Sequence, residues 1–528
     1  MAGKDMSLPA IVLQLTGGLL QLFKCLSRFT MVKELKDFDN FASISLTVHS
    51  YYKNLIGNPQ FTHADIRQAL ITFCCDHLLL PDDLSSFVVR DQLLHNLIRQ
   101  SEEILKEHGS TQTIKQSLQL LINFTYATAL ILGRFKTDYQ DISTLINGAS
   151  ASRVTDVAVL VGDSHCNGCR VATVTLENAV KLVYKPRSLL VDAYFQWFVS
   201  WLNLQLPRLH LRPYKTIQRS DYGWTEFIPH KYCETAEEIN GFYTRCGRYL
   251  ACFHLLSSTD MHFENLIAFG EYPVFVDLET LITPKVHSPN PLGRDYHSVV
   301  DTFVLPQVFG IPTRALDDQT KPITPFHKQK VDDFGALAYM RLEYETTRKV
   351  HVKYNLPISG QLPLLDIDRC ILHLCSGFEE VYDIFVKFRS FLTSRKFIGR
   401  LEYLPIRVLV RSTRSYIQLL RYITSDHGAS ERERLFAALK ESATRSTLYS
   451  HTIESELRDL NNGDVPYFTT TVNSTIVKDS HGQNLCGIIE QSALDCFKTK
   501  VSRLGSQDKN IQLWFIQNSF RGALSYAS

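Results

Sequence analysis

The sequence predicts an α+β fold in which a kinase-like catalytic core lies between a helical N-terminal region and helical C-terminal additions. Three observations predict it. Residues 1–150 repeat apolar side chains at spacings of three and four, as amphipathic helices do. Short β-rich runs bounded by Gly or Asn follow from about Val154. Residues 259–280 then carry acidic and amide side chains in an order that phosphoryl transfer uses.

The length of 528 residues predicts about three units of roughly 150 residues each. We expect a helical N-terminal subdomain over 1–150, a kinase-like core with a nucleotide and metal site over 151–284, and a C-terminal part over 285–528. The formal net charge of +2 gives no reason to expect nucleic acid or an acidic membrane as partner. The twelve cysteines show no framework spacing and are typical of reduced cytoplasmic thiols.

The first part of the chain contains helical and then strand-like segments. Helical spacing marks three segments: Ile66–Phe73, Leu93–Leu105 and Ile114–Leu132. Strand-like texture marks three more: Ala158–Val161, Val171–Leu176 and Val180–Tyr184. Asn167-Gly168 is a strong turn signal between the first two strands.

A further helix is expected over 236–256, with Thr235 and Glu238 as a capping box at its start. A loop over 260–265 and a hairpin over 266–276 follow it. This arrangement predicts that the polar residues of 259–280 sit on a loop and at a strand end, where rigid elements commonly display chemistry.

Residues 285–365 are rich in Pro with polar interruptions, and we expect loops there. Helical texture returns at Ile371–Leu392 and Glu431–Leu460. Ile11–Phe23 and Leu118–Leu132 are apolar, but the first is short and polar residues interrupt the second. We therefore expect no membrane span, no signal peptide and a cytoplasmic location.

Asp260, Asn265 and Asp277 form the central motif. Protein kinases place a catalytic Asp five residues before a metal-binding Asn, and a second metal-binding Asp follows on a nearby strand. Asn265 is five residues after Asp260, and Asp277 ends the apolar run Pro273–Val276. The pattern predicts a carboxylate near the acceptor hydroxyl and hard oxygen ligands for Mg²⁺ on ATP phosphates.

Lys185 closes an alternating strand, as expected of a lysine that neutralises ATP phosphates. No GxGxxG loop or Walker A motif precedes it, and the segment before it is Gly162–Gly168 instead. Either the phosphates are covered in another way, or the fold is a kinase-like relative. His262 either orients the loop backbone or contacts the acceptor or a phosphate. Glu279 either reaches a metal or pairs with Lys185, and ordinary loop or strand charges are the alternative for both.

Seven segments together resemble the dehydratase domain of class II lanthipeptide synthetases, the LanM family. They are Gly162–Gly168, Tyr184–Arg187, Tyr222–Glu226, Thr259–Asn265, Phe275–Leu281, Arg407–Tyr416 and Gly463–Phe468. The likeness runs from roughly residue 150 to the Gln512-Leu-Trp-Phe-Ile stretch near the C-terminus.

The resemblance implies a lipid-kinase-like fold and a two-step reaction on a precursor peptide bound through its leader. Ser or Thr is phosphorylated with ATP and Mg²⁺, and phosphate is then eliminated to give dehydroalanine or dehydrobutyrine. The phosphorylation set that it implies is Lys185, Asp260, His262, Asn265 and Asp277, with Glu279 beside the nucleotide and metals. The elimination set that it implies is Asp163, His165, Arg407 and Thr413. Arg407 suits a phosphate because its planar fork grips two oxygens, although Ile406–Val410 otherwise looks like a plain strand.

Full-length members of that family also carry a C-terminal zinc-dependent cyclase, and no Cys/His zinc cluster follows the dehydratase-like part here. A separate cyclase, an uncyclised product and a truncated member are the three explanations. Two rival functions also remain: a peptide or small-molecule kinase without elimination, and a non-catalytic precursor-binding pseudoenzyme.

Overall fold

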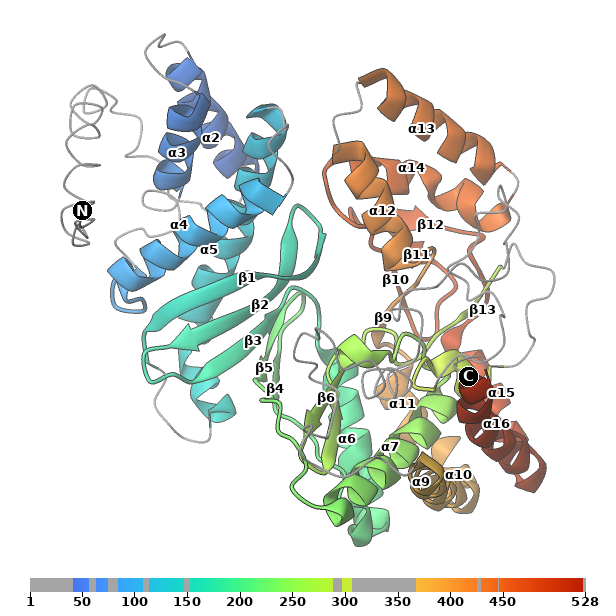
Figure 1. Cartoon of the computed structure of the whole chain (residues 1–528). Helices are drawn as coiled ribbons and strands as arrows, with labels where there is room; N and C mark the ends of the chain where they lie inside the picture. Colours follow the sequence, from blue (N-terminus) through green and yellow to red (C-terminus); the bar gives the residue numbers. More distant parts are fainter. Residues whose placement is uncertain are drawn as a thin grey trace.

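The computed structural model describes residues 41–56, 63–74, 84–107, 114–146, 152–287, 297–305, 367–424, 429–444 and 446–525. Ile11–Phe23 and most of the expected loop region 285–365 lie outside these residues. Helices and small antiparallel sheets mix along the chain, as Figure 1 shows, so the protein is α+β. Within the described part, no helix is long and apolar enough to cross a membrane.

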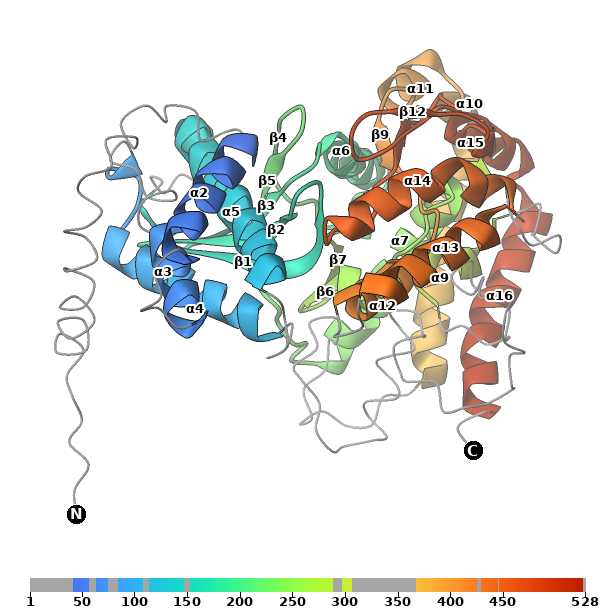
Figure 2. The ribbon, with the colours of Figure 1, turned by 90° about the horizontal axis from the view of Figure 1, so that it is seen from above.

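A five-stranded sheet lies against the N-terminal helices (Figures 1 and 2). The helices are α2 (Phe41–Ile56), α3 (His63–Phe73), α4 (Arg90–Glu107) and α5 (Ile114–Leu145). The strands run in the order β1 (Val154–His165), β2 (Cys169–Leu176), β3 (Lys181–Lys185), β5 (Gly223–Glu226) and β4 (Thr216–Gln218). The helices and strands predicted in this region are confirmed, and the predicted turn Asn167-Gly168 joins β1 to β2.

The core of this part is shared between the helices and the sheet. Alternate strand residues such as Val174, Leu182 and Trp224 point toward α5, where Ile131 and Phe135 are buried in the same cluster. A second cluster joins segments before residue 285 to segments after residue 366. The three-domain division stays a prediction, and the buried clusters cross both of its boundaries.

In the second cluster, two long helices cross so closely that the backbone of each contacts the backbone of the other. These are α7 (Ala236–Leu256) and α9 (Ile367–Lys387). A Cβ added at Gly247 would lie 1.9 Å from the carbonyl oxygen of Leu374, and one at Gly377 would lie 1.8 Å from that of Thr244. The two glycines therefore let the helices approach more closely than any side chain would permit.

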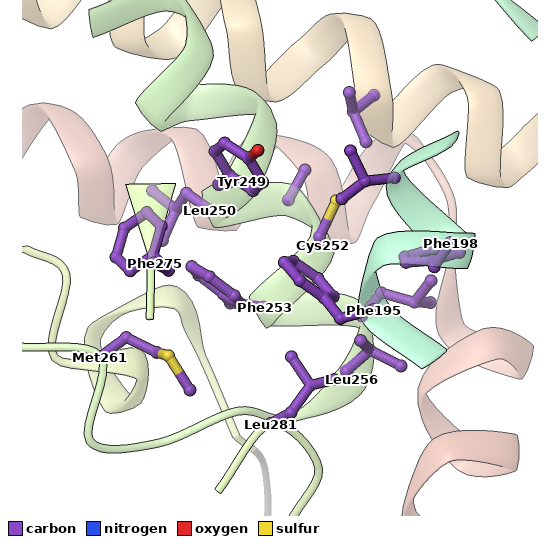
Figure 3. Packing of buried hydrophobic residues seen from close by; sticks show 14 of the residues in the cluster. Phe195, Phe198, Tyr249, Leu250, Cys252, Phe253, Leu256, Met261, Phe275 and Leu281 are labelled. Carbon is purple, nitrogen blue, oxygen red and sulfur yellow. The ribbon is translucent and has the colours of Figure 1, made fainter. Parts of the chain in front are cut away.

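Aromatic side chains fill the space between α7, α6 (Leu190–Gln205) and β7 (Tyr272–Phe275), as Figure 3 shows. The rings of Phe195 and Phe253 stack with centroids 5.6 Å apart, and Phe253 meets Phe275 edge-on at 4.7 Å. These contacts fix the end of α7 and the end of β7 relative to each other, and both ends lead into the polar motif.

Helix α7 has the bounds that its periodicity predicts. The Thr235 hydroxyl accepts a hydrogen bond from the Glu238 amide at 3.2 Å, but the Glu238 carboxylate bonds to the amide of Glu234 instead of closing a capping box on Thr235. At the other end, Ser257 is left-handed, with φ 55°, and the chain turns into the loop that carries Asp260. The short helix η5 (Phe263–Asn265) and the predicted hairpin, β6 (Leu266–Phe269) with β7, follow.

The C-terminal part holds a four-stranded sheet, a two-stranded sheet and several helices (Figure 1). The strands are β9 (Pro405–Arg407), β10 (Thr469–Thr471), β11 (Val477–Lys478), β12 (Asn484–Leu485), and β13 (Ile489–Gln491) paired with β8 (Lys285–Val286). The helices are α10 (Arg389–Leu392), α11 (Arg395–Leu401), α12 (Thr413–Thr424), α13 (Ala429–Ala443), α14 (Thr447–Asn461), α15 (Ala493–Arg503) and α16 (Ser506–Ser525).

The helical texture predicted over Glu431–Leu460 is confirmed as two helices, α13 and α14, which pack against each other in one apolar cluster. One expectation for this part is wrong in detail. The strand-like run Ile406–Val410 forms a strand only as far as Arg407, because the chain leaves the sheet to enter α12.

Candidate active site

Lys185 ends β3 and is buried, with 5 % of its surface exposed. Its Nζ lies 3.3 Å from Oδ1 of Asp192, in the first turn of α6, and donates to the carbonyl of Val276. The Tyr214 hydroxyl also donates to Asp192, at 3.0 Å. Burial would raise the pKa of Asp192, but the charges of Arg187 and Lys185 outweigh it and lower that pKa. The lysine is therefore held by a buried ion pair.

Arg187 links this pair to the carboxylates of the central motif. It donates to Asp192 at 2.7 Å and to Asp277 at 2.9 Å, and its Nε lies 3.5 Å from Glu279. The pKa of Asp277 is lowered because Arg187 and Lys185 outweigh the opposing effect of burial. Sequence reasoning missed both Arg187 and Asp192. The only signal for the arginine was its place in the segment Tyr184–Arg187.

Asp260 lies in the loop after α7 and has a left-handed backbone, with φ 64°. Burial raises its pKa to about 6, although nearby His262 and Arg407 oppose the rise. The Nε2 atom of His262 is 3.6 Å from Oδ1 of Asp260. A carboxyl with this pKa is able to accept a proton near neutral pH.

Asn265 is tied to the same loop. Its side-chain nitrogen donates to the carbonyl of Asp260 at 2.8 Å, and its backbone N–H donates to the carbonyl of His262 at 3.0 Å. Because the nitrogen is used in this way, the side-chain oxygen is left as the atom with lone pairs for a cation. These two hydrogen bonds therefore close a short turn between Asp260 and Asn265.

Glu279 accepts hydrogen bonds from Arg407 and from the Tyr467 hydroxyl, the latter at 3.2 Å. The expectation that Glu279 pairs with Lys185 is wrong, because Asp192 already occupies the lysine. The guanidinium of Arg407 also lies over the Tyr467 ring, 5.2 Å from its centroid. Tyr467 lies in the segment Gly463–Phe468 of the resemblance but is not among the predicted site residues.

Asp163 and His165 lie two residues apart near the end of β1, where its pairing with β2 is irregular. Burial raises the pKa of Asp163, although Arg407 opposes the rise. Burial and Arg407 lower the pKa of His165 to about 3, so its ring is neutral at pH 7. Its Nδ1 is 2.7 Å from the carbonyl of Val465. Since a carbonyl only accepts, Nδ1 carries the proton and Nε2 keeps a lone pair.

The turn after His165 is held from the C-terminal part. Backbone amides of Asn167 and Gly168 donate to the Asp464 carboxylate at 2.7 and 3.0 Å, and Val465 donates to the carbonyl of Ser164 at 2.8 Å. This buried carboxylate fixes the tip of the β1–β2 hairpin in the way that backbone-bonded carboxylates do.

The structure joins four of the predicted residues in one set of ion pairs. Arg187 and Asp192 connect Lys185, Asp277, Glu279 and Arg407. Thr413 is not part of it. It begins α12, six residues after Arg407, and its hydroxyl makes no hydrogen bond within the described part of the chain.

The oxygen atoms of Asp277 and Asn265 suit a hard cation that is bound by few protein ligands. Over the described ranges, no group of three His, Cys, Asp or Glu side chains surrounds one ion position. Mg²⁺ typically takes one or two carboxylates and completes its shell with phosphate oxygens and water. The Asp277 carboxylate, 39 % exposed, and the Asn265 side-chain oxygen fit that pattern.

Comparison with known proteins identifies the family. Residues 112–471 match the family model described as "Domain of unknown function (DUF4135)", and this range contains every site residue above. The chain therefore belongs to the DUF4135 family. It is also 28 % identical over 420 residues to the lacticin 481/lactococcin biosynthesis protein LcnDR2 of Lactococcus lactis subsp. lactis. That match covers 74 % of this chain and 44 % of the relative, so the chain spans less than half of the relative's length. The resemblance to class II lanthipeptide synthetases is confirmed.

Proposed function

We propose that this chain is a lanthipeptide dehydratase with a kinase-like, lipid-kinase-like core. It phosphorylates Ser or Thr of a precursor peptide with Mg-ATP and then eliminates the phosphate. The observation that carries the proposal is the ion pair between Arg407 and Glu279. It joins a residue of the elimination set to the segment of Asp277, so both half-reactions have their residues in one site.

ATP and Mg²⁺ fit the charges of this site. Lys185 would neutralise phosphate oxygens, while Asp277 and Asn265 would hold the metal ion. Bound Mg-ATP supplies an electrophilic γ-phosphoryl group whose charge is shared with the metal. Protein kinases hold their phosphate-binding lysine with a helix-borne glutamate, and the buried pair of Lys185 with Asp192 supports the same role here.

Asp260 accepts the proton of the Ser or Thr hydroxyl in the first half-reaction. Its raised pKa supports this assignment, since a base is most effective when its pKa lies near the working pH. His262, 3.6 Å from Asp260, orients that carboxylate.

The second half-reaction needs a base for the α-proton and a cation on the phosphate. The base takes the proton from Cα, the electron pair of that bond forms the Cα=Cβ bond, and the Cβ–O bond breaks as phosphate leaves with its pair. The pKa directions favour Asp163 as the base, because burial moves its pKa toward neutrality and moves that of His165 away. Arg407 grips the leaving phosphate.

The test uses the purified chain, Mg-ATP and a Ser/Thr/Cys-rich precursor peptide encoded beside its gene. Dehydration is read by mass spectrometry as a loss of about 18 Da per reacted residue, the mass of water eliminated. A stable gain of about 80 Da indicates a kinase without elimination. Peptide binding with no mass change indicates a precursor-binding pseudoenzyme.

Two parts of this proposal concern the setting of the reaction. We propose a cytoplasmic location, because the reaction consumes ATP. Ring closure on the dehydrated product would need a cyclase activity, and a separate cyclase is the partner that we propose for it. Adding such a cyclase to the dehydrated peptide and counting free thiols tests this step.

A further inference from the structure

The loop carrying Asp260 is fixed by hydrogen bonds on both sides of that residue. The Thr259 amide donates to the Thr280 carbonyl at 3.1 Å, and the Thr280 hydroxyl donates back to the Thr259 carbonyl at 2.7 Å. The Met261 amide donates to the Thr302 carbonyl at 2.9 Å. Asp260 itself has a φ of 64°, a conformation that a non-glycine residue keeps only when its surroundings over-determine it. The direction of its carboxylate therefore depends on these neighbours.

One of these neighbours is the short helix η6 (Val299–Thr302). Besides the bond to Met261, its Asp301 carbonyl accepts from the Thr259 hydroxyl at 3.1 Å. A capping box between Ser298 and Asp301 holds the helix in shape. So η6 touches the residue before Asp260 and the residue after it.

Helix η6 is in turn held by α16. The fully buried Gln512 accepts from the Val299 amide at 3.0 Å and donates to Asp508 at 3.0 Å. Asp508 also accepts from the Tyr382 hydroxyl at 2.6 Å and lies 3.2 Å from Nε2 of His254, in the last turn of α7. Helix α16 therefore contacts both the helix that leads into the Asp260 loop and the element that braces it.

A second C-terminal helix adds to this support. Lys500 of α15 is buried, and its Nζ donates to the carbonyl of His297, next to the start of η6. Gln512 belongs to the Gln512-Leu-Trp-Phe-Ile stretch of the resemblance, for which the phosphorylation and elimination sets give no role. Its contacts are to η6 and α16 and not to the Lys185 or Asp277 side of the site.

We propose that α16, acting through Gln512 and η6, positions Asp260 for the acceptor step. Gln512 and Thr259 are then positioning residues: they set the carboxylate that receives the hydroxyl proton and leave nucleotide binding alone. This inference rests on the role proposed for Asp260.

The first test measures the loop itself in the full chain, by hydrogen–deuterium exchange of a peptide covering 257–265. Thr259→Val removes the hydroxyl donor at constant shape, and Gln512→Ala removes the contact with η6. Both should speed exchange of this segment about tenfold, because the loop amides lose part of their protection. Thr259→Ser keeps the donor, and Gln517→Ala changes an exposed glutamine of the same helix. Neither control should change the exchange.

The second test separates turnover from binding with the precursor peptide of the dehydration assay. Thr259→Val and Gln512→Ala should lower kcat for phosphorylation about tenfold to a hundredfold while the KM for ATP stays unchanged, since a misplaced carboxylate affects the reacting geometry. Thr259→Ser should restore kcat.

Unchanged exchange in both variants, or an unchanged kcat despite faster exchange, overturns the inference. If Gln512→Ala fails to fold, the Thr259 pair carries the test. If Asp260→Ala leaves phosphorylation intact, the proposed role of Asp260 fails instead, and exchange still reports whether the brace exists.

Discussion

Arg407 contacts Glu279 twice: its guanidinium donates to the carboxylate, and its backbone amide donates to the Glu279 carbonyl at 2.9 Å. The backbone bond fixes the end of β9 (Pro405–Arg407) beside the segment that follows β7. The side-chain bond keeps a buried guanidinium from being an uncompensated charge. This double contact makes Arg407 part of the same charged network as Asp277, and it has consequences for several variants.

Replacing Arg407 with Ala should separate the two half-reactions. Loss of the guanidinium removes the group that grips the leaving phosphate, so phosphorylated peptide should accumulate and dehydrated peptide should fall, by about a hundredfold in rate. Mass spectrometry of the peptide over time measures both. Arg395→Ala, an exposed arginine of α11, is the control and should dehydrate the peptide normally. Finding only unmodified peptide with Arg407→Ala would contradict the elimination role.

Replacing Asp192 with Ala should destabilise the fold. It leaves the buried cations of Lys185 and Arg187 without their shared carboxylate, and breaking a buried pair costs about 3–5 kcal/mol in free energy of unfolding. Urea denaturation measures this. Glu234→Gln breaks an exposed pair with Lys231 and should cost less than about 1 kcal/mol. Equal stabilities of the two variants would refute the structural role of Asp192.

The pKa of about 6 for Asp260 predicts an acid limb in the rate of phosphorylation. The rate should fall as pH drops through about 6, because the protonated carboxyl is unable to accept the hydroxyl proton. Rates of phosphopeptide formation between pH 5 and pH 8 (a range set by roughly one to two units around this pKa) measure it. A flat profile across this range would argue against Asp260 as the base.

The same pKa makes a prediction about stability. Because the folded-state pKa is raised, the folded protein binds the proton more tightly than the unfolded chain, and stability is lost as the pH rises from about 4 to about 6. Asp260→Asn should therefore be inactive yet at least as stable as the wild type at neutral pH, with the advantage disappearing near pH 4, roughly the ordinary pKa of Asp. Thermal unfolding at both pH values checks this.

The crossing of α7 and α9 should tolerate no side chain. Gly247→Ala or Gly377→Ala places a methyl group within 2 Å of a backbone oxygen of the facing helix and should destabilise the protein by about 1–3 kcal/mol or more. Gly399→Ala, in α11 with no atom within 4 Å of the new Cβ, is the matched control and should be neutral or stabilising. Similar unfolding midpoints for all three would mean that the helices are able to move apart.

The sequence was a good guide wherever a structure depends on nearby residues. Apolar periodicity predicted the bounds of α7, and short β-rich runs bounded by Gly or Asn predicted the strands β1 to β3. A loop was predicted over 260–265, and within it the Asn265 side chain donates a hydrogen bond to the Asp260 carbonyl. The sequence was a poorer guide beyond Arg407. There the strand-like run Ile406–Val410 leaves the sheet, and a helix begins at Thr413.

By itself, the sequence determined the family, the order of the chemical motifs and most of the local elements, because helical and strand patterns and short turns are set by neighbouring residues. Only the tertiary structure decided the partners of the charges. Lys185 pairs with Asp192, and Arg407 pairs with Glu279 across 128 residues of chain. Arg187 contacts the carboxylates of Asp192, Asp277 and Glu279. The physical reason is desolvation: once folding buries a charge, it must be compensated by whichever opposite charge the packing brings beside it, and that choice is not local in sequence.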